Sequence, residues 1–346
     1  MNKFKKVGLS ALAGSLAAFA ANAGELAVSG SAEVTYHNDS GSGDTTGNPF
    51  GLQKKVKFSG SGELDNGYSF TFMTHQLQSA AGWTSAHLTL DMGDMGTIGF
   101  DQGSGLGHVG GIDDVTPTAG EEVWHGLGTT TYAYYGPGTT GSTSAWNYAL
   151  PTIVDGLAVN VNYVNQTGGG KTNADGNSGA TTSLKGSGTD VIFSYSGDMV
   201  PGLTIGGGIG DVDSTTTATG SYEDNVWYVK YAMGPITVGY SEFESRYTST
   251  GTANGHDGNV WGVSFAVNDN LSVSYGESEV SFLTSGYSGN AINGSGSQVE
   301  QTTEGVNISY SMGGMTIRGT QTEGANMDGT TGSSDELTEV SVSLAF

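Results

Sequence analysis

The sequence predicts an all-β protein, a 16-stranded antiparallel transmembrane β-barrel with short turns at one end and long loops at the other. Apolar and polar residues alternate with a period of two along many short segments, and turn residues separate these segments. After the N-terminal region, no apolar run approaches the roughly 18 residues of a membrane helix. The chain holds no cysteine, so disulfides and thiolate metal sites contribute nothing.

Residues 1–23 have the pattern of a secretory signal peptide. Three lysines precede an apolar stretch over 7–20, and Ala21-Asn22-Ala23 is a small-x-small cleavage site. A structural N-terminal helix is the alternative, but this stretch is too short to span a bilayer. We expect residues 24–346 to form the mature barrel, with eight Lys and Arg against 34 Asp and Glu. Such an acidic chain lacks the basic face that nucleic acid requires.

Sixteen segments carry the strand pattern. The last shows it most clearly, because Val340, Val342 and Leu344 share one parity while Ser341 and Ser343 share the other. Between two later segments, Asn268 to Asn270 read as a tight turn. In chain order the segments are 26–37, 56–64, 68–78, 85–91, 97–101, 144–150, 157–165, 190–195, 203–211, 225–232, 236–246, 261–267, 271–275, 303–310, 315–322 and 337–346.

Short connections alternate with long ones rich in Gly, Ser, Thr, Asp and Asn, which are 38–53, 166–188, 212–224, 247–258, 281–302 and 323–335. An even number of strands with both termini on the short-turn side is typical of bacterial membrane barrels. A soluble β-sandwich or a β-helix would share the alternation, but the sequence lacks a two-sided core to cover the apolar faces. Disorder is disfavoured by the 16 Tyr, 12 Phe and 5 Trp at alternate spacing.

Several motifs resemble the general Gram-negative porin family over the whole mature chain. Residues 90–100 (LDMGDMGTIGF) are similar to the family's fourth strand, turn and fifth strand. Trp146-Asn147-Tyr148 through Pro151 and Leu157 resembles its sixth strand, proline turn and seventh strand. Phe346, with apolar residues alternating before it, resembles the signal read by the barrel-insertion machinery.

The resemblance implies a trimeric, multi-pass barrel of the cell outer membrane, in contact with lipid and lipopolysaccharide. It also implies a third loop, about 102–143, that folds into the lumen. This loop carries the acidic residues Asp113, Asp114, Glu121 and Glu122, which would attract cations in a narrow passage. The alternative is a solvated acidic loop outside the pore.

Five charged or titratable residues are candidates for the pore wall. Strand parity directs Lys57, His75, His87 and Arg318 into the lumen, where they could form a basic side opposite the acidic loop. Glu33 would pair with Lys57 or Arg318. Isolated lumen charges without consequence are the alternative, especially for the two histidines. Family members typically carry an arginine cluster on this wall, whereas few basic residues are available here.

The chain shows no catalytic constellation, so we expect a protein that is not an enzyme: nucleophile elbow, metal-binding His pair and phosphate loop are all missing from the sequence. No cofactor is expected, with Ca²⁺ as the one hypothesis. Its candidate ligands are the oxygen donors Asp211, Asp213, Glu223 and Asp224. A plain solvated loop is the alternative there, because EF-hand spacing is absent.

These observations predict a water-filled, cation-favouring channel for passive diffusion of small hydrophilic solutes and ions. A substrate-specific channel is one alternative, although such channels commonly need a track of aromatics in the lumen and most aromatics here have the outward parity. A structural or adhesive barrel with a plugged lumen is the other. The natural solute and the pore radius do not follow from the sequence.

Overall fold

A computed structural model describes residues 26–41, 47–77, 85–104, 106–112, 115–127, 145–165, 185–214, 221–249, 252–283 and 299–346. Asp113, Asp114, the signal-like segment 1–23 and the last part of the third loop lie outside these ranges. Within them, no helix is long and apolar enough to cross a membrane.

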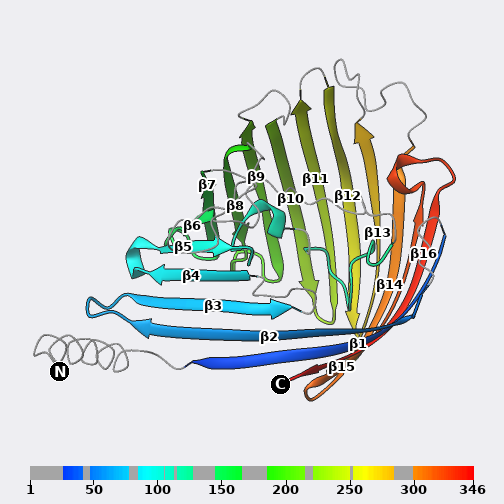
Figure 1. The fold of residues 1–346 in the computed structure, drawn as a ribbon, viewed down its shortest axis with the longest axis horizontal. Coiled ribbons are helices and arrows are strands. Elements are labelled where there is room, and N and C mark those ends of the chain that lie inside the picture. The colour runs from blue at the N-terminus through cyan, green and yellow to red at the C-terminus, as the bar shows by residue number, and fades with distance from the viewer. Residues whose placement is uncertain are drawn as a thin grey trace, which may run out of the picture.

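The described residues form sixteen strands in one closed antiparallel barrel, in which each strand pairs with its sequence neighbours and β16 pairs with β1 (Figure 1). The predicted 16-stranded fold is therefore confirmed. The strands are β1 (Ala27–Gly41), β2 (Phe50–Glu63), β3 (Ser69–Leu77), β4 (Ser85–Asp91), β5 (Thr97–Gln102), β6 (Ala145–Ala149), β7 (Leu157–Val164), β8 (Lys185–Tyr195), β9 (Leu203–Ser214), β10 (Ser221–Met233), β11 (Ile236–Ser249), β12 (Thr252–Ala266), β13 (Leu271–Leu283), β14 (Gln301–Met312), β15 (Met315–Ala325) and β16 (Ser334–Ala345). Short 3-10 helices are η1 (Gly93–Met95), η2 (Val109–Gly111) and η3 (Met327–Gly329).

The two faces of the sheet differ in the way that the alternation predicts. Apolar side chains stand exposed on the outside, with Leu52 at 58%, Leu88 at 51% and Val306 at 54% exposure. On β14 the neighbours of Val306 alternate with it, so that Thr303 and Asn307 are buried toward the inside. An apolar outer face this extensive needs a hydrocarbon surrounding, since a protein in water would cover it.

The strands run further than the hydropathy pattern indicates. The prediction of a long loop over 247–258 is wrong, because β11 reaches Ser249 and β12 starts at Thr252. Backbone pairing continues beyond the apolar band, where both faces of the ladder carry polar residues and the alternation is lost.

The barrel closes through backbone hydrogen bonds at the base of β1. The Gly30 amide donates to the Phe346 carbonyl at 2.8 Å, and the Phe346 amide donates to the Gly30 carbonyl at 2.9 Å. A Cβ atom at Gly30 would lie 2.5 Å from the Phe346 ring and 3.0 Å from the Lys55 carbonyl oxygen, so a larger residue here would displace the ring. The Phe346 side chain itself is 76% exposed.

The chain after β5 turns inward and crosses the inner side of the wall formed by β9 to β14 (Figure 1). Inward-facing glycines allow its close approach. A Cβ atom at Gly276 would lie 2.9 Å from Val123 Cγ1, and one at Gly305 would lie 3.1 Å from Val123 Cα. The segment also brings Val109 and Ile112 into a buried apolar cluster with side chains of β10 to β13. The barrel interior is thus partly occupied by 106–112 and 115–127.

Candidate functional site

Hydrogen bonds to the barrel wall fix the start of the inward segment. The buried Asp101 carboxylate on β5 accepts hydrogen bonds from the amides of Ser104, at 2.9 Å, and Leu106, at 3.1 Å. The Asp190 carboxylate on β8 accepts one from the Val109 amide at 3.2 Å. Carboxylates that accept backbone amides position a loop firmly, because charge-assisted bonds are stronger than neutral ones.

Polar side chains of β13, β14 and β15 hold the second half of the segment. Ser274 Oγ accepts from the Ala119 amide at 2.8 Å. Asn307 binds Glu121 twice, accepting from its amide at 3.1 Å and donating to its carbonyl at 2.9 Å. Thr322 Oγ1 donates to the His125 carbonyl at 2.9 Å. Because the backbone is bound to the wall, the charged side chains of this segment can face the remaining lumen.

Arg318 joins the loop to the wall. Its guanidinium NH1 lies 2.7 Å from Glu121 Oε1 and 3.8 Å from Glu33 Oε1. These side chains are 32%, 22% and 17% exposed, so the pair is shielded from bulk water only in part. The geometry unites three of the predicted site residues, and Glu33 pairs with Arg318.

A second set of ion pairs continues from Glu121 along the wall. His125 Nδ1 lies 3.5 Å from Glu121 Oε2, and its Nε2 lies 3.5 Å from Glu339 Oε1 on β16. Glu339 Oε2 lies 3.6 Å from His37 Nδ1 on β1. His37 Nε2 lies 4.0 Å from Asp39 Oδ2. Together with Arg318 and Glu33, these residues form a seven-residue charge network, which we call the lumen network.

A turn in the loop produces this arrangement. The His125 amide donates to the Glu122 carbonyl at 3.0 Å, which brings residues four apart onto one side of the turn. Burial lowers the pKa of His125, but the hydrogen bond with Glu339 and the negative charges of Glu121, Glu339 and Glu122 outweigh this effect. The pKa of His125 is therefore raised above its ordinary value.

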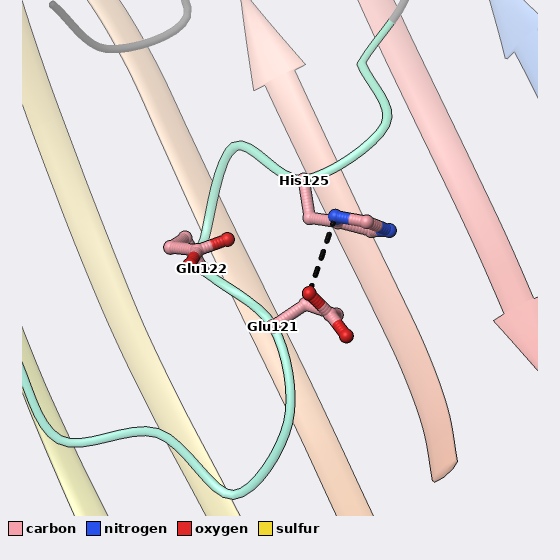
Figure 2. Close-up of side chains that lie close together, drawn as sticks. All are labelled: Glu121, Glu122 and His125. Atoms are coloured by element: carbon pink, nitrogen blue, oxygen red, sulfur yellow. Dashed lines mark ion pairs between the residues drawn. The ribbon is translucent and has the colours of Figure 1, made fainter. Parts of the chain in front are cut away.

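Glu121, Glu122 and His125 form a cluster with one potential metal-ligand atom each. Those atoms all lie within 4.8 Å of one another, and all three side chains are half-buried. Figure 2 shows them leaving the same stretch of the loop, with the Glu121 carboxylate directed toward the His125 ring.

The other predicted wall residues lie on β2, β3 and β4. Lys57 stands opposite His75 in the β2–β3 ladder. His87 stands opposite Asp101 in the β4–β5 ladder, and its Nδ1 lies 2.8 Å from Ser104 Oγ. His87 therefore contacts the start of the loop. Arg318 is engaged by Glu121 and Glu33 on the β1–β15 side of the barrel.

The predicted Ca²⁺ ligands fall on two faces. Glu223 stands opposite Asp211 in the β9–β10 ladder, and Asp213 shares the parity of Asp211. Asp224 has the other parity and is 5% exposed, so it cannot join the other three. The reason is that β9 and β10 extend through this region, where the sequence suggested loop ends.

Sequence reasoning missed His125, Glu339, His37 and Asp39. The motif Glu121-Glu122-Val123-Trp124-His125 places a histidine four residues after an acidic one, a spacing that could have indicated a shared side of a turn. Glu339 and His37 have the inward parity of their strands. Their meeting with His125 depends on contacts between distant segments, which no local pattern encodes.

A model of the family described as Gram-negative porin matches residues 8–316. Among solved structures, a porin refined at high resolution is 17% identical, with a TM-score of 0.63 and coverage of 93% of this chain and 100% of that one. The anion-selective porin from Comamonas acidovorans is 14% identical, with a TM-score of 0.65 and coverage of 93% and 99%. Salmonella typhi OmpF in complex with daunomycin is 15% identical, with a TM-score of 0.61 and coverage of 93% and 98%. A search of curated proteins finds no match.

Proposed function

The chain belongs to the Gram-negative porin family and forms a β-barrel of the outer membrane, and from this premise we propose that it is a passive diffusion channel that favours cations. Family and fold support a water-filled passage for small hydrophilic solutes and ions. Porins are channels and not enzymes, and solutes cross them along their own gradients. The preference for cations depends on charges of this chain alone.

The lumen network is the observation that carries the proposed preference. Within the described residues it joins four carboxylates, one guanidinium and two imidazoles. The network is negative even when both histidines are protonated, and Glu122 adds a further carboxylate beside it. Negative charge in a narrow, partly low-dielectric passage raises the local concentration of cations and lowers that of anions. Asp113 and Asp114 would add to this effect if they face the same passage.

The fold by itself does not determine the sign of the preference. A barrel with a TM-score of 0.65 to this one is described as an anion-selective porin. Similar walls can therefore carry either selectivity, and the distribution of side-chain charge decides between them.

We extend the proposal to the surroundings of the barrel. Its exposed apolar outer face would contact lipid and lipopolysaccharide, and part of it would be covered in a homotrimer, as the family likeness suggests. Phe346, exposed at the base of the closing strand pair, would be the residue that the barrel-insertion machinery reads. Asp211, Asp213 and Glu223 remain candidates for a divalent ion at the outer surface, without Asp224.

A planar bilayer with a potassium chloride gradient tests the channel and its preference. We expect stable conductance and a reversal potential whose sign indicates cation selectivity. A reversal potential of the opposite sign would contradict the charge argument, and an absence of conductance would favour the adhesive, plugged barrel. Flux that saturates with one sugar, measured by liposome swelling, would favour the substrate-specific channel.

A further inference from the structure

We propose that Glu121, Glu122 and His125 bind a divalent transition-metal ion of the Zn²⁺ class inside the barrel. This metal site deepens the proposed channel function, because an ion held on the loop would stand in the passage that the loop narrows. Binding itself depends only on the three ligands and their neighbours, so it can be measured apart from conductance.

Two of the three donor atoms are already spaced for coordination. His125 Nδ1 lies 3.5 Å from Glu121 Oε2. Two ligands of a tetrahedral zinc ion, each about 2.1 Å from the metal, stand roughly 3.4 Å apart. A Glu122 oxygen lies within 4.8 Å of both, a gap that rotation of one flexible side chain closes. The turn has thus placed three ligands from five consecutive positions around one point.

Neighbouring side chains orient Glu121 and His125 toward the proposed metal position. Arg318 holds Glu121 Oε1 at 2.7 Å, which leaves Oε2 for the metal. Glu339 Oε1 lies 3.5 Å from His125 Nε2, the ring nitrogen that faces away from Glu121. A carboxylate behind a histidine is the usual support of a zinc-bound imidazole, since it fixes the ring and its tautomer. His37, at 3.6 Å, supports Glu339 in turn.

The ligand set identifies the class of ion. Imidazole nitrogen together with carboxylate oxygen suits Zn²⁺ and neighbouring transition metals, whereas Ca²⁺ prefers six to eight oxygen ligands. Three protein ligands leave at least one position for water. A site of this kind exchanges its metal with the solution in the lumen, which is consistent with half-buried ligands.

A purely structural role for the cluster makes a different prediction. If Glu121 and His125 only anchor the loop to Arg318 and Glu339, neutralising Glu122 leaves those three ion pairs in place, because none of them includes it. The Glu122→Gln variant therefore separates the two roles. It keeps the lumen network intact and removes one metal ligand.

Isothermal titration of the detergent-solubilised, folded protein with zinc chloride tests the binding. We expect one Zn²⁺ per chain, at least tenfold weaker binding in Glu122→Gln and His125→Gln, and at least hundredfold weaker binding of Ca²⁺ to the unaltered protein. His75→Gln, which removes a histidine outside the cluster, should bind Zn²⁺ unchanged. Absence of Zn²⁺ binding, equal affinity in Glu122→Gln, or equal affinity for Ca²⁺ would overturn the proposal.

Bilayer recordings connect the site to the passage. Micromolar Zn²⁺ should reduce the conductance of the unaltered channel reversibly on addition of chelator, and should leave Glu122→Gln unaffected. If Zn²⁺ binds in the titration but conductance does not change, the ion does not stand in the passage and that part of the proposal is wrong. Absence of conductance in chelator alone would refute the channel and leave the titration result standing.

Discussion

Replacement of Arg318 by glutamine tests the electrostatic account of the lumen directly. The substitution removes the one guanidinium of the lumen network and keeps a hydrogen-bonding amide in its place. Glu33 then loses its positive partner, Glu121 keeps only His125, and the passage becomes more negative by one charge. The Glu121 backbone stays bound to Asn307 at 3.1 Å and 2.9 Å, so the loop should remain docked.

The expected change follows from the position of the charge. A unit charge about 5 Å from the path of an ion contributes about 0.8 kcal/mol in water, and screening over a Debye length of about 8 Å leaves about 0.4 kcal/mol. This energy raises the local cation concentration about twofold and lowers that of anions about twofold. The permeability ratio of potassium to chloride should therefore rise about fourfold in Arg318→Gln.

Reversal potentials in a planar bilayer under a potassium chloride gradient measure this ratio. The matched control is Arg246→Gln, which removes the same charge from β11. Arg246 lies on the same, outer face of this strand as the exposed Val238, and it pairs with Glu244. The control should leave the ratio unchanged. If Arg318→Gln behaves like the control, or shifts the potential toward anions, the lumen network does not set the selectivity.

Three further predictions concern the loop and the barrel closure. In chelator-containing salt, cation preference should increase as the pH rises through the pKa of His125, which is raised above the ordinary value of 6.5. The reason is that the positive charge of the imidazolium is present below that pKa and lost above it, so His125→Gln should not show this pH-dependent increase. Gly305→Val should displace the loop at Val123, since even a Cβ atom there would lie 3.1 Å from Val123 Cα, and single-channel current should become noisier while β-sheet circular dichroism is retained; quiet, unchanged openings would refute the close packing. Gly30→Leu should lower the yield of heat-resistant folded barrel, because its side chain would displace the Phe346 ring and crowd the Lys55 carbonyl at the closing strands. Gly60→Leu, with open space at its Cβ, should fold normally, and equal yields would show that the contact is dispensable.

The sequence was sufficient to predict those features that depend on local periodicity. The alternation of Val340 and Ser341 on β16 predicted both the strand and its two faces. Arg318, which the same rule directs inward, contacts Glu121 of the inward segment. The rule reached its limit where strands leave the hydrocarbon. Polar residues then occupy both faces, so β11 and β12 were predicted too short and the connection between them too long.

The candidate site was harder to predict because it joins segments that are distant in the sequence. Glu121 was a predicted residue, but its wall partners are Arg318 on β15 and Asn307 on β14, and His125 lies beside a carboxylate on β16. These contacts arise only once the loop lies against the inward glycines Gly276 and Gly305, whose role no periodicity indicates. Asp224 and Glu223 show that residues adjacent in the sequence can also be kept apart, since consecutive residues on a strand point in opposite directions.

The pairing of Gly30 with Phe346 has a consequence for biogenesis. β1 cannot acquire its second neighbour until β16 has been synthesised and delivered, so until that moment both margins of the growing sheet expose unsatisfied amides and carbonyls. Insertion into lipid before closure would be costly, and release into the periplasm would invite aggregation. An escort that shields both margins until the final strand arrives is therefore a physical requirement of this topology.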